Sequence, residues 1–219
     1  MIASTALTQT LISPPLPDSL FVPGEPLKLG ILASGSGSNF EAIAQAIQQQ
    51  QLNAQIEVLI YNNPKAKVLE RAKKYNIPAI LLNHRHYKKR EDLDQKIAET
   101  LKQFDVKLVV MAGWMRIVTP VLIDAFPQQM INLHPSLLPS FPGIHAVEQA
   151  LAAHVKITGC TVHWVEPAVD SGPIILQAAV PVLPEDTPDT LHGRIQAQEH
   201  QIMVGAIAKI QRSMRGNRQ

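Results

Sequence analysis

The chain of 219 residues is short of cysteine and of aromatic residues, with a single cysteine and 5% aromatic content. One cysteine cannot form an internal disulfide, and it cannot supply a cysteine-based zinc cluster. We therefore interpret Cys160 as a small core residue and expect no metal. The sequence also lacks an apolar run of about 18 residues, the length that a membrane-spanning helix needs.

Charge of either sign is scarce, since charged residues make up 17% of the chain and the formal net charge is +2. So small an excess of positive charge favours neither a nucleic acid nor a membrane surface as a partner. Hydrophobic residues make up 46% of the chain, which is enough for a sizeable aliphatic core. The length and composition together predict one α/β domain with a possible appendage.

The first 26 residues differ in composition from the rest. Four prolines lie between residues 14 and 23, and the segment has neither the basic start of a secretion signal nor the arginines of an import peptide. We interpret residues 1–26 as a proline-rich extension without an assigned role, either flexible or draped on the domain, and residues 27–219 as a single catalytic domain. The expected location is the cytoplasm.

Apolar runs alternate with segments of helical periodicity over most of the domain, which predicts right-handed βαβ units and a doubly wound, mainly parallel sheet with a Rossmann-like N-terminal half. The expected strands of this part are residues 28–33, 56–60, 79–82, 106–111 and 129–133. Two later strands, residues 158–166 and 173–182, have no helix between them and should pair antiparallel at one edge. A long helix over residues 187–211, with Thr187 as its N-cap, should close the chain.

A glycine-rich loop, residues 34–39, joins the first strand to the first helix. Backbone amides at a helix N-terminus attract an anion. A dinucleotide is disfavoured, because Phe40 replaces the third glycine of the G-x-G-x-x-G pattern and the second strand ends in Tyr61-Asn62-Asn63, without a carboxylate for a ribose. A terminal phosphate monoester suits the loop better, and a plain capped turn is the alternative. The carboxyl ends of strands are where ligands gather in such sheets, which favours the phosphate.

Three polar side chains at strand ends indicate chemistry. Asn132 and His134 lie two apart at the end of the fifth strand and so face the same way, and Asp170 lies in the turn after His163. An amide can polarise a carbonyl, an imidazole can transfer protons, and a carboxylate helps an imidazole to stay protonated. Each residue alone is compatible with a structural role, but together they favour acyl transfer to an amine. His163, inside a strand, is assigned a supporting or core role.

Five segments, which span residues 28 to about 211, resemble the phosphoribosylglycinamide formyltransferase family, folate-dependent enzymes of purine biosynthesis. They are Ser34-Gly35-Ser36-Gly37-Ser38-Asn39, Ala112-Gly113-Trp114-Met115-Arg116-Ile117-Val118, Ile131 through Pro139 with Phe141-Pro142-Gly143, Val169-Asp170-Ser171-Gly172-Pro173, and Gln196-Ala197-Gln198-Glu199-His200. The N-L-H-P-S-L-L-P and D-x-G-P blocks together are specific for folate-dependent formyl transfer. The glycine loop and Q-x-Q-E-H narrow the match to the glycinamide ribonucleotide branch.

The resemblance implies a formyltransferase fold that moves the formyl group of 10-formyltetrahydrofolate, a co-substrate, to the amine of glycinamide ribonucleotide without a metal. In the implied site, His134 donates a proton, Asn132 meets the formyl oxygen, and Asp170 keeps His134 protonated. The implied ribonucleotide contacts are Gly37, Ser38 and Asn39 for the phosphate and Glu199 for the ribose. The implied folate contacts are Arg90, Met115, Arg116, Ile117, Val118 and Asn132. The partners would be small molecules, and the chain a monomer or homodimer.

The sequence departs from the family pattern at two places. Trp114 stands where a smaller aromatic residue is expected, at the edge of the implied folate pocket. The turn at residues 61–67 is basic and lacks the acid expected there, so its part near the phosphate is open.

Three rival functions are expected to be excluded. A formyltetrahydrofolate deformylase should carry a regulatory domain ahead of the glycine loop, where the chain has too few residues for one. A formyltransferase for initiator methionyl-tRNA should carry a basic C-terminal domain. A non-catalytic phosphate-binding module would leave Asn132, His134 and Asp170 without a shared purpose.

Overall fold

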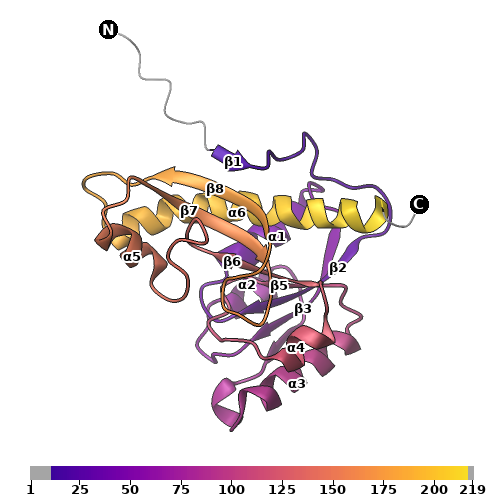
Figure 1. Ribbon diagram of the computed structural model, residues 1–219. Helices are drawn as coiled ribbons and strands as arrows, with labels where there is room; N and C mark the ends of the chain where they lie inside the picture. Colours follow the sequence, from indigo (N-terminus) through magenta and orange to yellow (C-terminus); the bar gives the residue numbers. More distant parts are fainter. Residues whose placement is uncertain (1–10, 217–219) are drawn as a thin grey trace.

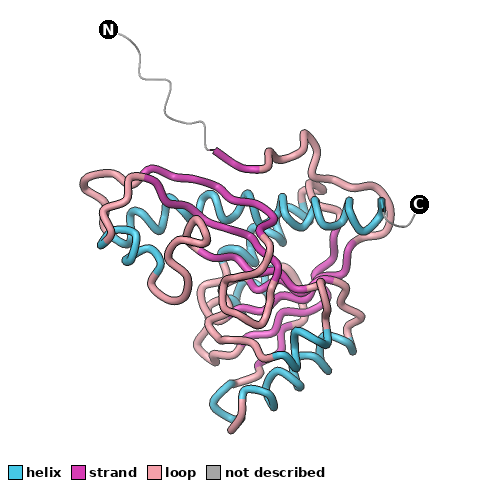
Figure 2. Tube along the Cα trace, in the orientation of Figure 1, coloured by secondary structure: helices cyan, strands magenta, loops and turns pink. Residues whose placement is uncertain are grey.

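The computed structural model describes residues 11–216, which form one eight-stranded sheet with helices on both faces (Figures 1 and 2). The strands are β1 (Leu11–Ser13), β2 (Leu27–Ala33), β3 (Ala54–Tyr61), β4 (Ala79–Leu81), β5 (Leu108–Met111), β6 (Met130–His134), β7 (Ile157–Trp164) and β8 (Ile174–Pro181). The helices are α1 (Ser38–Gln48), α2 (Val68–Lys74), α3 (Arg90–Gln103), α4 (Pro120–Ala125), α5 (Ala146–Ala152) and α6 (Pro188–Gly216), with a short 3₁₀ helix at His84–His86.

The strand order β1-β8-β7-β6-β5-β2-β3-β4 confirms the predicted α/β fold. The strands from β6 to β4 in this order pair in parallel, whereas β7 and β8 pair antiparallel beside β6. The seven predicted strands lie within two residues of the observed ones. The predicted cap of α6 is also present, since the hydroxyl of Thr187 accepts a hydrogen bond from the backbone N–H of Thr190.

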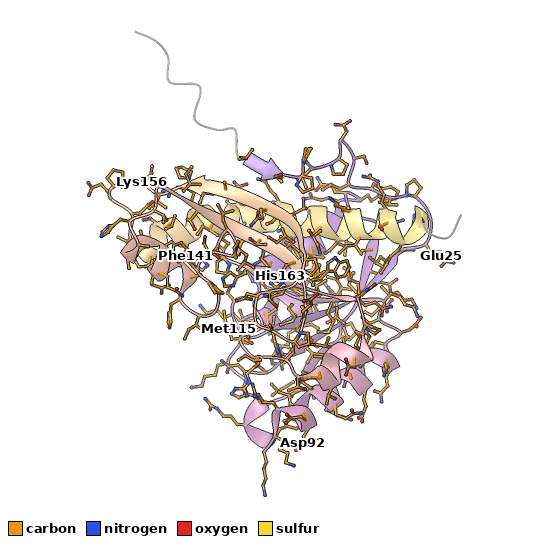
Figure 3. The ribbon with its side chains drawn as sticks, in the orientation of Figure 1. Glu25, Asp92, Met115, Phe141, Lys156 and His163 are labelled. Atoms are coloured by element: carbon orange, nitrogen blue, oxygen red, sulfur yellow. The ribbon has the colours of Figure 1, made fainter. Side chains whose placement is uncertain are left out.

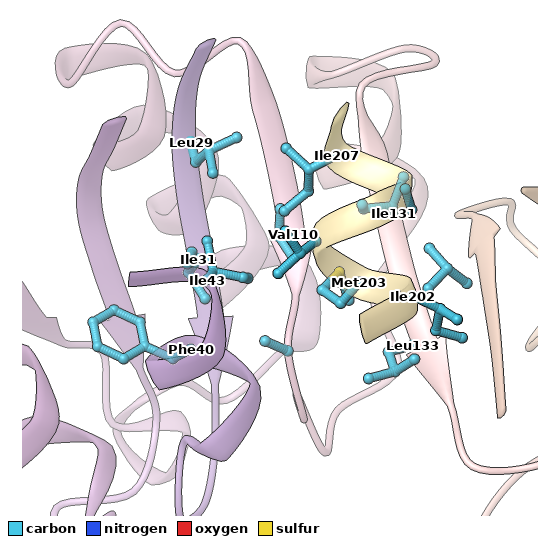
Figure 4. Packing of buried hydrophobic residues seen from close by; sticks show 14 of the residues in the cluster. Leu29, Ile31, Phe40, Ile43, Val110, Ile131, Leu133, Ile202, Met203 and Ile207 are labelled. Atoms are coloured by element: carbon cyan, nitrogen blue, oxygen red, sulfur yellow. The ribbon is translucent and has the colours of Figure 1, made fainter. Parts of the chain in front are cut away.

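The parallel strands are buried on both faces, which explains their continuous apolar runs. On β5, Leu108 and Val110 face one hydrophobic cluster, while Val109 and Met111 face the other. Figure 4 shows the first cluster, in which side chains of β2, β5 and β6 meet α1 and α6; the labelled members are Leu29, Ile31, Phe40, Ile43, Val110, Ile131, Leu133, Ile202, Met203 and Ile207. Helices α3 and α4 contribute to the second cluster on the opposite face.

The direction of strand addition reverses at β2, which lies between β3 on one side and β5 on the other. Loops that leave the carboxyl ends of β2 and β5 therefore diverge to opposite faces and leave a crevice between them, the usual ligand position in open α/β sheets. Ser34 connects the two loops, because its N–H donates to Gly113 O at 3.0 Å and its hydroxyl accepts from the N–H of Met115 at 2.9 Å. The fold thus places the glycine loop next to residues 113–118.

Residues 11–26 pack against the domain, which is the second of the two arrangements that the sequence left open. β1 pairs antiparallel with β8, and Leu16 lies so close to Gly205 of α6 that a Cβ there would come within 2.3 Å of it. Arg212 and Arg215 donate to the backbone carbonyls of Ser19 and Val22. These bonds help to explain why α6 extends beyond residue 211. Residues 1–10 of the extension lie outside the described part, and the division at residue 27 stays a prediction.

None of the helices described between residues 11 and 216 combines the length and the apolar character that crossing a membrane requires.

A matched pair of glycine substitutions tests the packing of β7 on β8. A Cβ at Gly159 would lie 1.9 Å from the carbonyl oxygen of Ala178, whereas a Cβ at Gly193 of α6 would meet nothing within 4 Å. We expect Gly159→Ala to lower the free energy of unfolding by more than about 2 kcal/mol. Gly193→Ala should raise it by roughly 0.5–1 kcal/mol, because alanine favours a helix interior over glycine. Chemical denaturation measures both, and equal effects would contradict the described β7–β8 contact.

Candidate active site

A cavity of about 550 Å³ opens at the carboxyl ends of β5 and β6. Three segments supply most of its wall: residues 113–118 after β5, residues 143–148 around the start of α5, and residues 165–170 after β7. Asn132, His134 and His163 also line it. In Figure 3, His163 lies near the centre of the molecule with Phe141 and Met115 nearby in this view. The cavity is therefore bounded on one side by apolar residues and on another by a group of titratable side chains.

The antiparallel pairing of β6 with β7 brings the predicted polar residues together. Asn132 is paired with His163 in this register, and His134 with Thr161. The turn after β7 then carries Asp170 back over them, so that its Oδ2 lies 3.3 Å from Nδ1 of His134. Nδ2 of Asn132 donates to Oδ1 of Asp170 at 3.4 Å. The three residues singled out from the sequence thus form one contiguous group.

The carboxylate of Asp170 is held by hydrogen-bond donors on several sides. Burial raises the pKa of Asp170, but the imidazole of His163 at 3.7 Å, the hydrogen bond from the backbone N–H of Gly143 at 2.8 Å and the charge of His134 outweigh that effect and lower it. The backbone of Asp170 lies in the left-handed region, with φ at 52°, where aspartate is more tolerated than most residues. The result is a charged acceptor fixed beside an imidazole.

Both ring nitrogens of His134 face acceptors. Nδ1 faces Asp170, and Nε2 lies 2.8 Å from the carbonyl oxygen of Phe141. A neutral imidazole donates from only one nitrogen, so both contacts are hydrogen bonds only in the doubly protonated ring. The side chain is almost fully buried, and its position is thereby fixed from both ends.

His163 belongs to this group, although the sequence placed it only in a supporting or core role. Its Nε2 lies 3.2 Å from Nδ2 of Asn132 and 3.7 Å from Oδ1 of Asp170, and its Nδ1 donates to the carbonyl of Trp164 at 2.8 Å. The sequence feature that could have indicated this role is the predicted antiparallel pairing of residues 158–166 and 173–182 at one edge of the sheet. Only the register of β7 on β6, which the sequence does not give, puts His163 opposite Asn132.

The glycine loop and α6 form a second polar group beside the first. Gly37 is the N-cap of α1 with φ at 75°, and a Cβ there would lie 2.3 Å from Val68. Asn39 donates to the carboxyl of Glu199 at 2.9 Å, and Gln196 donates to the hydroxyl of Ser38 at 3.0 Å.

Burial governs the carboxyl of Glu199. It raises the pKa of this group, and the bond from Asn39 and the charges of His192 and His134 only partly oppose the shift. Ser38, Asn39 and Glu199 thus lie together outside the lining of the main cavity, and their contact with a ribonucleotide stays a prediction.

The predicted folate residues divide into two sets. Met115, Arg116, Ile117 and Val118 all line the cavity, and Met115 is 78% exposed at its edge. Arg90 is the first residue of α3, is exposed, and is not among the lining residues. Its contact with folate stays a prediction.

In the described part of the chain, no three His, Cys, Asp or Glu side chains are grouped so that they could hold a metal ion. Cys160 is fully buried in the core, as predicted, and burial raises the pKa of its thiol. It is therefore unsuited to act as a nucleophile.

The chain is similar to several characterised proteins. It is 42% identical over 173 residues to the phosphoribosylglycinamide formyltransferase of Bacillus subtilis, covering 79% of this chain and 89% of that protein. It is also 42% identical over 180 residues to the human trifunctional purine biosynthetic protein adenosine-3, covering 82% of this chain but only 18% of that longer protein.

Solved structures agree with these sequence matches. Glycinamide ribonucleotide transformylase 1 from Symbiobacterium toebii superposes with a TM-score of 0.83 at 44% identity, covering 85% of this chain and 88% of that one. The phosphoribosylglycinamide formyltransferase of Bacillus halodurans gives 0.81 at 44% identity, with 84% and 94% covered. The formyl transferase family model matches residues 27–207. The chain therefore belongs to the formyl transferase family.

Proposed function

We propose that this protein transfers the formyl group of 10-formyltetrahydrofolate to the amine of 5-phosphoribosylglycinamide, giving formylglycinamide ribonucleotide and tetrahydrofolate. The observation that carries the proposal is the contact of Asn132, His134 and Asp170 at one end of a 550 Å³ cavity. The relatives named above are formyltransferases of purine biosynthesis by name. The cytoplasmic location and the monomeric or dimeric state remain predictions.

The proposed reaction is an attack of the glycinamide nitrogen on the formyl carbon. The carbonyl electrons move to the oxygen, which would accept hydrogen bonds from Asn132 and from Nε2 of His134, the latter in place of the contact with Phe141 O. The amine then loses a proton and N10 of the folate gains one, and the carbonyl re-forms as the bond between the formyl carbon and N10 breaks. Preorganised donors of this kind each stabilise a transition state by about 3–4 kcal/mol. Asp170 serves as the fixed counter-charge of the imidazolium.

The NH2 group of Asn132 carries two protons, which limits the number of acceptors it can bind at one time. Its Nδ2 faces both His163 at 3.2 Å and Asp170 at 3.4 Å. The longer bond, to Asp170, is the weaker one. We infer that a formyl oxygen replaces this contact, while the bond to His163 keeps the amide oriented.

The two substrates would enter from different sides. The apolar residues 115–118 suit a flat heterocycle, so the folate would occupy the main cavity. The phosphate of the ribonucleotide would meet the amides at the start of α1, next to Gly37, Ser38 and Asn39. Glu199 would then accept a hydrogen bond from a ribose hydroxyl.

The requirement for an amine distinguishes this function from deformylation. Tetrahydrofolate release should need glycinamide ribonucleotide, and its rate without that amine should be close to the uncatalysed one. Release into water at the same rate with and without the ribonucleotide would instead favour a deformylase.

Removing the imidazole or the charge beside it should impair turnover more than binding. We expect His134→Ala to lower kcat by about a hundredfold or more, the usual contribution of a positioned proton donor, with a small change in either KM. Asp170→Asn should also lower kcat. His154→Ala and Asp124→Asn are matched controls at exposed positions outside the cavity. Steady-state kinetics decide the matter, and nearly full turnover of Asp170→Asn at neutral pH would disprove its role.

Glu199→Gln should affect one substrate only. Because Glu199 contacts Asn39 rather than the folate segment, we expect the KM for glycinamide ribonucleotide to rise about tenfold, since the single carbonyl oxygen of glutamine is taken by Asn39 and its NH2 group cannot accept a hydrogen bond from the ribose. The KM for 10-formyltetrahydrofolate should stay within twofold, a margin of roughly 0.4 kcal/mol. Glu185→Gln, an exposed change ahead of α6, is the control. A rise in the folate KM alone would contradict the assignment.

The lowered pKa of Asp170 also predicts a pH dependence of stability. A carboxyl whose pKa falls on folding stabilises the native state above its ordinary value of 3.8, and this contribution is lost as the pH drops through the lowered pKa. The difference in unfolding free energy between the parent protein and Asp170→Asn should therefore persist down to about pH 4 and shrink below it, as the carboxyl becomes protonated. Denaturation at several pH values measures it. A difference that vanished already at pH 6 would contradict the lowered pKa.

A further inference from the structure

Asp94 of α3 is a buried carboxylate that the proposed reaction does not use. Only 2% of the residue is exposed, and none of the ion pairs among residues 11–216 involves it. Its Oδ2 accepts a hydrogen bond of 2.5 Å from the backbone N–H of Thr119. Burying a carboxylate without a partner cation lowers the stability of the fold. The presence of Asp94 here, with a single hydrogen bond from Thr119, therefore needs a functional explanation.

Thr119 is the point where residues 113–118, which line the cavity, end and α4 begins. The next residue, Pro120, has no N–H, so the amide of Thr119 is the last backbone donor before the helix. Asp94 therefore binds the end of the loop through a backbone donor of that loop.

The other end of the same loop has its own fixed points. The N–H of Ala112 donates to Leu32 O at 2.9 Å, and Ser34 binds both Gly113 and Met115. Arg116 and Ile117 lie between these bonds and the bond at Thr119. Within the described part of the chain, neither forms a backbone hydrogen bond to a loop or turn. The position of these residues along the cavity wall therefore depends on the two anchored ends.

We propose that Asp94 is a positioning residue for the folate co-substrate, which fixes the rear end of residues 113–118 so that Arg116, Ile117 and Val118 present a preformed wall to the folate ring. This inference rests on the function proposed above. Asp94 touches no reacting atom. Its loss should therefore weaken folate binding, because the loop must then be ordered by the ligand itself, and should leave the step at His134 largely intact.

Three substitutions of Asp94 distinguish an effect on the position of residues 113–118 from an effect on the stability of the fold. Asp94→Leu has as many side-chain heavy atoms as aspartate and removes both the acceptor and the buried charge, although it leaves the N–H of Thr119 unpaired. Asp94→Asn keeps an acceptor oxygen and removes the charge. Asp94→Ala provides a second variant without an acceptor, should the leucine disturb folding. Asp92→Ala, exposed in the same turn of α3, is the matched control.

The measurements are kcat, the KM of each substrate and the dissociation constant of tetrahydrofolate, alongside the thermal midpoint of each variant. We expect Asp94→Leu and Asp94→Ala to raise the folate KM and the tetrahydrofolate dissociation constant about tenfold or more, with less than a threefold change in kcat and in the ribonucleotide KM. Asp94→Asn should restore most of the folate affinity, and Asp92→Ala should match the parent protein.

Two results would overturn the inference. One is a parental folate KM in Asp94→Leu or Asp94→Ala, whatever their thermal midpoint, and the other is an Asp94→Asn variant as impaired as the leucine. Failure of the proposed function itself would look different, because the parent protein would then show no formyl transfer from 10-formyltetrahydrofolate to glycinamide ribonucleotide.

Discussion

The antiparallel pairing of β6 with β7 is the constraint on which the site depends. It sets Asn132 opposite His163 and sends the chain into the turn that carries Asp170 back over His134. Because β7 runs antiparallel, it ends beside the start of β6, where the N–H of Val165 donates to Met130 O, and the following turn folds back to bring Asp170 to His134. A shift of one residue would turn His163 to the other face. The tight contact of Gly159 with Ala178 secures the next strand, β8, against β7.

Three buried carboxylates of this fold differ in charge preference because their surroundings differ. Asp170 meets two imidazoles and a backbone N–H, which together outweigh its burial and lower its pKa. Glu199 and Asp94 each have mainly one neutral donor, Asn39 and Thr119 respectively, and their pKa values are raised because burial dominates. The carboxyl with the lowered pKa is the one next to His134, where the proposed reaction needs a counter-charge. Glu199 and Asp94 are the residues proposed above for ribonucleotide binding and for positioning of the loop.

The sequence predicted the sheet well, because strands covered on both faces must be continuously apolar and the helices between them must be amphipathic. It singled out Asn132, His134 and Asp170 as candidates, and only the tertiary structure shows that they are in contact. Strand β1 was missed, since its pairing with β8 comes from tertiary contacts that override a proline-rich composition. The part played by His163 and Asp94 was also hidden. Each depends on a register or a long-range backbone contact, such as that from Asp94 to Thr119, for which residue types and spacing give no signal.

The coupling between His134 and Asp170 is best tested by a double-mutant cycle on kcat, with His134→Ala, Asp170→Asn and the combination of the two. If the carboxylate acts through the imidazole, the double variant should lose no more activity than His134→Ala alone, because residues that act as one unit are not additive. Losses that multiply would show that the two side chains act independently, and would contradict the site described above.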